Sequence, residues 1–357
     1  MVSTWLNGLV SGTVFAGVGY FGGGGTDSGR ATTVDKFALF DDSRSTLGTG
    51  LSTGTEGLAG MANSGTAGYF AGGWAGSRVT TVDKFAFPGD GRSTLGTGLS
   101  TGTQNQAGMA NSGTAGYFAG GYTPSYVTTV DKFAFSDDGR TTLGTGLSAG
   151  VSNNAAMANS GTAGYVGGGY TGSARVTTVD KFAFSDDGRT TLGTGLSAGV
   201  SNNAAMANSG TAGYVGGGYT GSARVTTVDK FAFSDDSRST LGTGLSAATN
   251  ELAAMANSGT AGYFGGGTTG SNVTTVDKFA FSDDSRSTLG TGLSAATKDL
   301  ASFAKSGTAG YFGGGNTGSR VATVDKFAFS DDSRSTLGTG LSAVTENLAA
   351  FADSGTL

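Results

Sequence analysis

The stretch Val276-Asp277-Lys278-Phe279-Ala280-Phe281 decides how this 357-residue chain folds, because close copies of it recur along the whole sequence. Its Val-Asp-Lys-Phe core occurs seven times, with the aspartates at Asp35, Asp83, Asp131, Asp180, Asp229, Asp277 and Asp325. Consecutive copies lie 48 or 49 residues apart. A period of this length indicates one supersecondary unit per repeat and a fold built by repetition.

One repeat, residues 252–294, has the pattern of four short strands separated by turns. Small residues at 252–257 precede a Ser-Gly-Thr turn, and a second segment at 261–267 ends in glycines. Residues 273–281 have the β-branched and aromatic composition of a strand, and an Asp-Asp turn leads to a more polar segment at 287–294. Four strands per repeat form a propeller blade, so we predict an all-β, seven-bladed β-propeller with four antiparallel strands per blade.

The two ends of the chain are out of phase with the repeats. The first glycine-ended segment, 19–23, lacks a small-residue strand to pair with, and the segment 348–353 has no repeat left to complete. We therefore predict that 348–353 pairs with 19–23 and closes the ring; the alternative is that residues 5–10 fill this place. Residues 1–18 are expected to form an apolar leader or attachment segment, and residues 19–357 the propeller.

The composition excludes several classes of function. The chain has no Cys, which excludes thiolate metal sites, and no His, which removes the commonest general base and metal ligand. With a formal net charge of -5 and its cations spread over all repeats, it has no basic stripe for nucleic acid. No apolar run reaches the roughly 20 residues that span a bilayer. We expect no catalytic residues, no metal site and no cofactor.

Each repeat also carries an Asp-Lys pair and, nine residues after the Asp, an Arg, as in Asp277 and Arg286. One interpretation is a sevenfold ring of charge that binds an anion. The other is structural, with each Asp paired to a Lys or Arg of a neighbouring strand or blade. The second is favoured, because charges between blades are tolerated only when paired.

Two of the four connections in each repeat change from copy to copy, whereas the Ser-Gly-Thr and Asp-Asp turns barely change. In an up-and-down blade the two variable connections lie at the same end, so one face of the ring is constant and the other is varied. Loops on a rigid scaffold are where binding is usually placed. The candidate ligand-binding residues on the varied face are Trp74, Arg78, Tyr122, Tyr126, Tyr170, Arg175, Tyr219, Arg224 and Arg320.

Aromatic rings beside planar hydrogen-bonding groups suit sugar rings, and they also suit protein surfaces. The alternative explanation for the variation is drift in loops that bind nothing. Glu56, Glu251 and Glu346 occupy comparable positions in separate repeats, so solvated loop ends are expected there rather than the paired carboxylates of a glycosidase.

The order of these segments resembles the kelch repeat, on the strength of Tyr263-Phe264-Gly265-Gly266 and Phe279-Ala280-Phe281 and their copies. The chain departs from that family where a Trp is expected after the third strand, because Leu289 stands near its place. The phrases Gly-Thr-Ala-Gly-Tyr-Phe-Gly-Gly-Gly and Val-Asp-Lys-Phe-Ala-Phe are also similar to repeat proteins of cyanobacterial bacteriophages, which implies a tail or fibre component.

We therefore expect a non-catalytic binding or structural module, placed on a virion or outside the cell, that contacts a host surface glycan. Residues 1–18 are expected to meet a virion assembly partner. Two alternatives stay open at this point: a pure scaffold for protein–protein assembly, and a polysaccharide-active enzyme.

Overall fold

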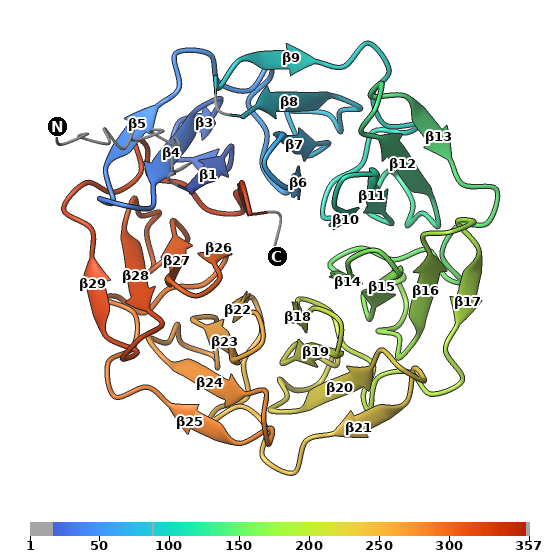
Figure 1. Ribbon diagram of the computed structural model, residues 1–357, viewed down its shortest axis with the longest axis vertical. Coiled ribbons are helices and arrows are strands. Elements are labelled where there is room, and N and C mark those ends of the chain that lie inside the picture. The colour runs from blue at the N-terminus through green and yellow to red at the C-terminus, as the bar shows by residue number, and fades with distance from the viewer. Residues whose placement is uncertain (1–16, 88, 355–357) are drawn as a thin grey trace, which may run out of the picture.

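The computed structural model describes residues 17–87 and 89–354, and in this part of the chain it confirms the predicted seven-bladed β-propeller. Seven four-stranded antiparallel sheets surround one axis, and β2 (Gly25–Thr26) and β3 (Gly29–Arg30) form a separate small hairpin in the connection between the second and third strands of blade 1 (Figure 1). None of the described residues forms a helix that could cross a membrane.

Each blade runs from an inner strand at the axis to a short outer strand. In blade 6 the order is β22 (Ala253–Asn257), β23 (Ala261–Gly265), β24 (Val276–Ala280) and β25 (Arg286–Thr288). The outer strand is shorter than the predicted segment, because only three of its residues pair with β24 before the chain turns toward the next blade.

The same order, from the axis outward, holds in the other blades that are continuous in sequence. Their strands are β6 (Ala59–Asn63), β7 (Ala67–Ala71), β8 (Val82–Ala86) and β9 (Arg92–Thr94) in blade 2; β10 (Ala107–Asn111), β11 (Ala115–Ala119), β12 (Val130–Ala134) and β13 (Arg140–Thr142) in blade 3; β14 (Ala155–Asn159), β15 (Ala163–Gly167), β16 (Val179–Ala183) and β17 (Arg189–Thr191) in blade 4; β18 (Ala204–Asn208), β19 (Ala212–Gly216), β20 (Val228–Ala232) and β21 (Arg238–Thr240) in blade 5; and β26 (Ala301–Lys305), β27 (Ala309–Gly313), β28 (Val324–Ala328) and β29 (Arg334–Thr336) in blade 7.

Blade 1 joins the two ends of the chain. Its strands are β30 (Ala349–Ala352), β1 (Val18–Gly22), β4 (Val34–Ala38) and β5 (Arg44–Thr46). The strand β30 pairs antiparallel with β1, with Gly19 opposite Ala352 and Gly22 opposite Ala349. This confirms the predicted closure; the alternative strand, residues 5–10, lies outside the described residues. The strand β1 begins at Val18, one residue before the predicted domain boundary.

The apolar core lies between neighbouring blades rather than inside any one of them. Met61 and Val82 of blade 2, for example, form one buried cluster with Phe118 and Phe133 of blade 3. A Cβ atom at Gly116 of blade 3 would overlap the Met61 side chain, so this close contact requires glycine. The same contact occurs at all seven seams: Phe351 on Gly68, Met61 on Gly116, Met109 on Gly164, Met157 on Gly213, Met206 on Gly262, Met255 on Gly310 and Phe303 on Gly19.

The repeated aspartate of the third strand ties each blade to the connection that precedes it. Asp83 is 3% exposed, and its carboxylate accepts hydrogen bonds from Arg92 Nη1 (3.2 Å) and Thr94 Oγ1 (2.6 Å) of the same blade. The backbone N–H and hydroxyl of Ser52, which follows blade 1, donate to its other oxygen at 2.8 and 2.9 Å. The predicted structural pairing of these charges is therefore confirmed.

A second polar cluster crosses every seam between blades, and we call it the Tyr-Lys-Asp clamp. The Tyr20 hydroxyl and the Lys36 Nζ of blade 1 each donate to Asp90, which stands in the turn of blade 2 equivalent to the Asp-Asp turns of the other blades, both at 2.7 Å. Burial and the Asp90 carboxylate raise the pKa of Tyr20, so its hydroxyl stays protonated and donates. Tyr311 and Lys326 of blade 7 hold Asp42 in the same way and complete the ring.

Candidate functional site

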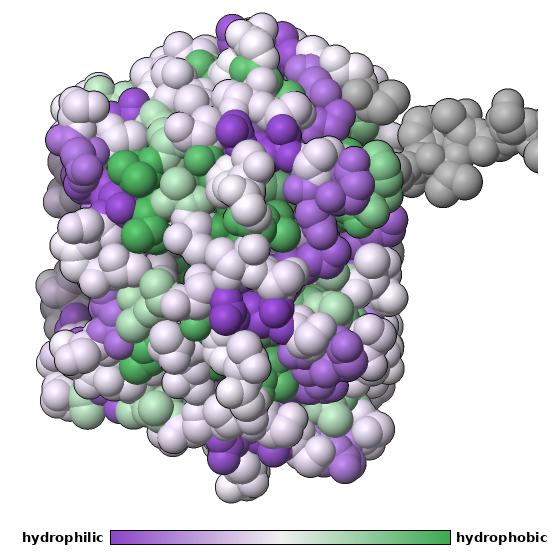
Figure 2. All heavy atoms as spheres, turned by 90° about the vertical axis from the view of Figure 1, so that its left-hand side faces the viewer, coloured by the Kyte–Doolittle hydropathy of each residue, from purple (hydrophilic) through white to green (hydrophobic). Residues whose placement is uncertain are grey.

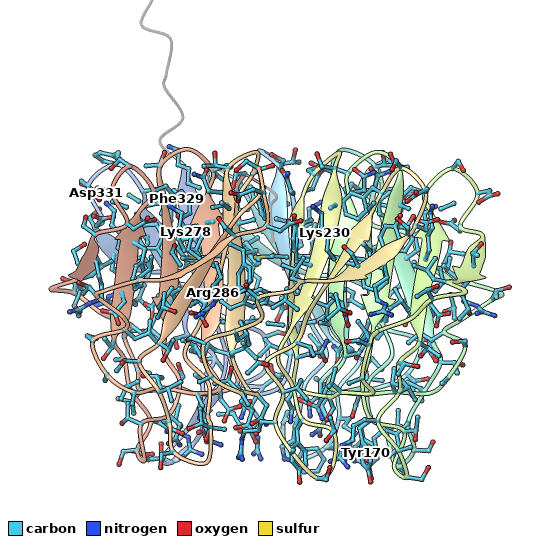
Figure 3. All side chains as sticks on the ribbon, turned by 90° about the horizontal axis from the view of Figure 1, so that it is seen from below. Tyr170, Lys230, Lys278, Arg286, Phe329 and Asp331 are labelled. Atoms are coloured by element: carbon cyan, nitrogen blue, oxygen red, sulfur yellow. The ribbon has the colours of Figure 1, made fainter. Side chains whose placement is uncertain are left out.

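The two faces of the ring are built from different connections. The Ser-Gly-Thr and Asp-Asp turns form one face, and the connections that change between repeats form the other; we call them the constant face and the variable face. In Figure 3, Phe329 and Asp331 mark the constant face at the top, and Tyr170 marks the variable face at the bottom. The outer rim between them, shown for one side in Figure 2, mixes hydrophilic residues with small apolar areas.

On the variable face, one residue at the end of each loop between the second and third strands reaches toward the next blade. We call these seven positions the seam residues. In blade 2, for example, Arg78 pairs by backbone with Trp74 across the loop, and Tyr126 pairs in the same way with Tyr122 in blade 3. The seam residues, from blade 1 to blade 7, are Arg30, Arg78, Tyr126, Arg175, Arg224, Asn272 and Arg320.

In blades 1 and 2 the seam residues are arginines packed on aromatic rings. The Arg30 guanidinium lies 5.7 Å from the centre of the Trp74 ring in blade 2. The Arg78 guanidinium lies 4.9 Å from Trp74 in its own blade and 4.4 Å from Tyr122 in blade 3. These are cation–π distances, so each guanidinium is held by its aromatic neighbours.

The row continues across blades 3, 4 and 5. The Tyr126 ring lies 4.9 Å from Tyr122 in its own blade and 5.4 Å from Tyr170 in blade 4. The Arg175 guanidinium then lies 4.5 Å from Tyr170 and 5.0 Å from Tyr219 in blade 5. All these side chains are half-buried. We call this continuous row the ladder; it consists of Trp74, Arg78, Tyr122, Tyr126, Tyr170, Arg175 and Tyr219.

The ladder changes how its aromatic residues can act. We expected open ring faces for sugars to stack on, but Arg78 lies over both Trp74 and Tyr122, and Arg175 lies over both Tyr170 and Tyr219. The ring faces on those sides are covered. The groups that the ladder offers are therefore ring edges and guanidinium nitrogens.

The remaining seam residues are engaged by polar partners. Arg224 Nε donates to Asn250 Oδ1 at 2.7 Å, and Asn272 donates to the backbone carbonyl of Asn316 at 2.8 Å. Arg320, a predicted site residue like Arg224, lies 2.7 Å from Glu346 and 3.1 Å from Asp27. These two predicted residues lie on the variable face but outside the ladder.

The two arginines of the ladder have no counterion among the described residues, whereas the seam residue Arg30 has one. Arg30 forms an ion pair with Glu56 at 3.1 Å, whereas Arg78 and Arg175 make no ion pair or hydrogen bond within residues 17–87 and 89–354. In each of the latter two, Nε is buried without a partner, whereas the two terminal nitrogens are not among the fully buried atoms.

The structure thus brings seven of the nine predicted residues into the ladder, and it places Arg30, which was not among the nine, beside the ladder against Trp74. The loop of blade 1 is irregular because it contains the hairpin β2–β3, and this hid the position. A signal was nevertheless present, since Arg30 precedes Ala-Thr-Thr-Val in the same register in which Arg78 precedes Val-Thr-Thr-Val.

A second feature of the variable face lies at the axis. The residue that stands two positions before each inner strand has a positive φ between 52° and 63°. Its backbone N–H donates to the carbonyl of the equivalent residue in the preceding blade at 2.7–3.1 Å. These hydrogen bonds close into a ring around the axis. The ring residues are Gly57, Asn105, Asn153, Asn202, Glu251, Asp299 and Asn347.

An open cavity of about 210 Å³ is lined by this axial ring and by the residues that follow it. On one side Lys298 Nζ contacts both Glu251 (2.8 Å) and Asp299 (3.2 Å). Burial and the nearby Glu251 carboxylate raise the pKa of Asp299 to about 6. No group of three or more acidic residues that could hold a metal ion occurs in the described part of the chain.

Comparison with known proteins supports the fold and leaves the function open. No family model matches the chain, and no curated protein matches it. Among solved structures, the structure of YjhT is similar to it, with a TM-score of 0.63 and 15% sequence identity over 80% of this chain and 97% of that chain. At this level of identity the likeness concerns the propeller fold alone.

Proposed function

We propose that the protein is a non-catalytic binding module and that the ladder is its contact surface. The observation that carries this proposal is the ladder itself: a continuous row of half-buried rings and guanidinium groups over four blades, on the face where the loops change. Aromatic residues and Arg are the side chains that dominate binding energy at interfaces, and the propeller below holds them rigidly.

The ligand that we propose is a host surface glycan, and the protein would act as a tail or fibre component of a bacteriophage with a kelch-like propeller. The support is the resemblance of its glycine-ended and Val-Asp-Lys-Phe segments to such proteins, together with the polar and aromatic make-up of the ladder. In this proposal residues 1–18 meet a virion assembly partner, and the protein works on the virion or outside the cell.

A glycan array tests the proposal. The parent protein should bind at least one class of glycan, and Trp74→Ala and Tyr170→Ala should weaken that binding by about tenfold each, because truncating a central aromatic residue commonly costs more than 1 kcal/mol. Asn272→Ala is the matched control, since Asn272 is a seam residue outside the ladder; its binding should stay within about twofold of the parent. Binding to no glycan would favour the pure scaffold instead.

The enzyme alternative has its own test. Glu251 and Asp299 both line the axial cavity, so they are the carboxylates that a hydrolase would use there. We expect no release of reducing sugar from any polysaccharide that the protein binds. Turnover that is lost in Glu251→Gln, with binding retained, would contradict a non-catalytic role.

A further inference from the structure

We propose that the ligand of the ladder is an acidic polysaccharide, whose carboxylate or sulfate groups are bound by Arg78 and Arg175. This inference rests on the proposed function and names the ligand class for the same surface. It comes from comparing the seams of the chain with one another, since the same seam position carries an arginine with a counterion in some blades and without one in others.

The paired arginines show what the unpaired ones lack. Arg30 meets Glu56 at 3.1 Å, and Glu56 pairs by backbone with Trp74, the first residue of the loop in blade 2. Arg320 meets Glu346 at 2.7 Å, where Glu346 pairs by backbone with Gly25 in blade 1. In both seams the chain supplies its own carboxylate from the residue before the axial ring.

At the seams of Arg78 and Arg175 the equivalent residue is neutral, as it also is at the seam of Arg224, whose Nε is already held by Asn250 Oδ1 at 2.7 Å. Gln104 pairs by backbone with Tyr122 next to Arg78, and Ser201 pairs by backbone with Tyr219 next to Arg175. These two seams therefore have the arginine but lack the carboxylate that Glu56 and Glu346 supply in the seams of Arg30 and Arg320. A guanidinium without a counterion is ready to take an anion from a ligand, because no internal ion pair must first be broken.

The surroundings of these two guanidinium groups also favour an anion. Each lies over two aromatic rings, at 4.4–5.0 Å from their centres, so the planar fork is already oriented before a ligand arrives. The terminal nitrogens are not fully buried, and a guanidinium presents them in a geometry that matches a carboxylate or a sulfate. Preorganisation of this kind lowers the entropy cost of binding.

The spacing of the two arginines indicates a polymer. Arg78 and Arg175 belong to non-adjacent seams, and the seam between them carries Tyr126, which contacts the ladder on both sides. A chain with acidic groups on separated sugar units can reach both arginines, whereas one acidic sugar reaches only one. Nucleic acid fits less well, because it needs a row of cations and this chain has a formal net charge of -5.

Titration calorimetry with defined polymers tests the inference. The probes are polygalacturonate, which carries carboxylates, dextran sulfate, which carries sulfates, and neutral dextran, each at about 50 and about 300 mM NaCl because salt weakens exposed charge pairs. We expect binding to at least one acidic polymer, weaker binding at the higher salt concentration, and at least about tenfold weaker binding to dextran. The two acidic polymers distinguish a carboxylate from a sulfate as the group that is bound.

The variants use the internal comparison as their control. Arg78→Gln and Arg175→Gln should each weaken acidic-polymer binding by about tenfold, and the double variant by about 100-fold, whereas Arg30→Gln should change it by less than about twofold. Gln104→Glu and Ser201→Glu supply the missing carboxylate, so each should weaken binding about as much as loss of the neighbouring arginine. Glu56→Gln frees Arg30 and should strengthen binding by about threefold.

Several results would overturn the inference. Equal affinity for dextran and the acidic polymers, or unchanged binding in Gln104→Glu and Ser201→Glu, would remove the role of the unpaired arginines and leave glycan binding as such intact. Binding to double-stranded DNA as tight as to either acidic polymer would overturn the ligand class. Failure to bind any glycan in the array or any polymer would remove the proposed function with it.

Discussion

The constant face and the variable face hold neighbouring blades together in different ways. Toward the constant face, every seam carries the same Tyr-Lys-Asp clamp, from Tyr20, Lys36 and Asp90 round to Tyr311, Lys326 and Asp42. On the variable face the side chains that bridge the seams change around the ring, from guanidinium on ring to ring on ring, ion pair or amide. The difference teaches that stability can be provided by identical contacts at one end of the blades, which leaves the other end free to change its chemistry.

The largest loss of stability is expected from removing β30, because this strand closes the ring on which both faces depend. Deleting residues 345–357 removes β30, so β1 loses its pairing partner on the side of the axis. Blades 1 and 2 also lose the contact of Phe351 with Gly68. We expect the cooperative unfolding transition to disappear from thermal melts followed by circular dichroism. A permuted chain that places residues 345–354 before Val18 should recover it. A deletion variant that melts like the parent would contradict the closure.

The next effect separates the two faces within neighbouring blades. Asp138→Ala removes the carboxylate that accepts from Tyr69 (2.8 Å) and Lys84 (2.7 Å), and it should lower the free energy of unfolding by about 2–3 kcal/mol. Arg78→Gln, on the variable face of the blade that carries Tyr69 and Lys84, should cost about 0.5 kcal/mol, the value of an exposed cation–π contact. Urea unfolding measures both, and equal losses would contradict the division of roles.

A smaller effect depends on pH and concerns the axial ring. The pKa of Asp299 is raised to about 6, so the folded chain binds more protons than the unfolded chain between about pH 4 and pH 6. The contribution of Asp299 to stability is therefore present at low pH and is lost as the pH rises through 6. The charged groups around it are Glu251, Lys298 and Glu346.

Asp299→Asn tests this directly, because Asn already stands at four of the other ring positions. The variant should equal the parent in stability near pH 4 and exceed it by about 1–2 kcal/mol at pH 7. Urea unfolding at pH 4, 5, 6 and 7 measures the difference, with the exposed Asp186→Asn as control. A difference that does not change with pH would show that Asp299 titrates normally.

Much of the fold could be predicted from the sequence because the decisive contacts repeat with the sequence. Seven copies of one strand pattern predict seven blades, and the unpaired segments at the two ends predict which strand closes the ring. The position of the variable face followed from the alternation of strand directions alone. Even the glycines at the seams, such as Gly116, are visible as invariant positions within the repeat.

The chemistry of the candidate site was less predictable, because it depends on partners in the next blade. The sequence places Arg78 26 residues before Gln104 and Arg30 26 residues before Glu56, but nothing in that shared spacing says that these two positions meet across a seam. The covering of Trp74 by a guanidinium likewise appears only when the loops are set side by side. Glu251 and Asp299 stand where Asn is common in this chain, and only their shared positive φ assigns them to the axial ring.

One measurement tests the central claim most directly: the change in melting temperature that polygalacturonate causes in the parent protein and in the double variant Gln104→Glu/Ser201→Glu. A ligand that binds the folded state raises its melting temperature. The account predicts that the polymer raises the melting temperature of the parent and leaves that of the double variant, each compared with the same protein without polymer, unchanged. An equal rise in both proteins, or no rise in either protein with polygalacturonate and with dextran sulfate, would contradict it.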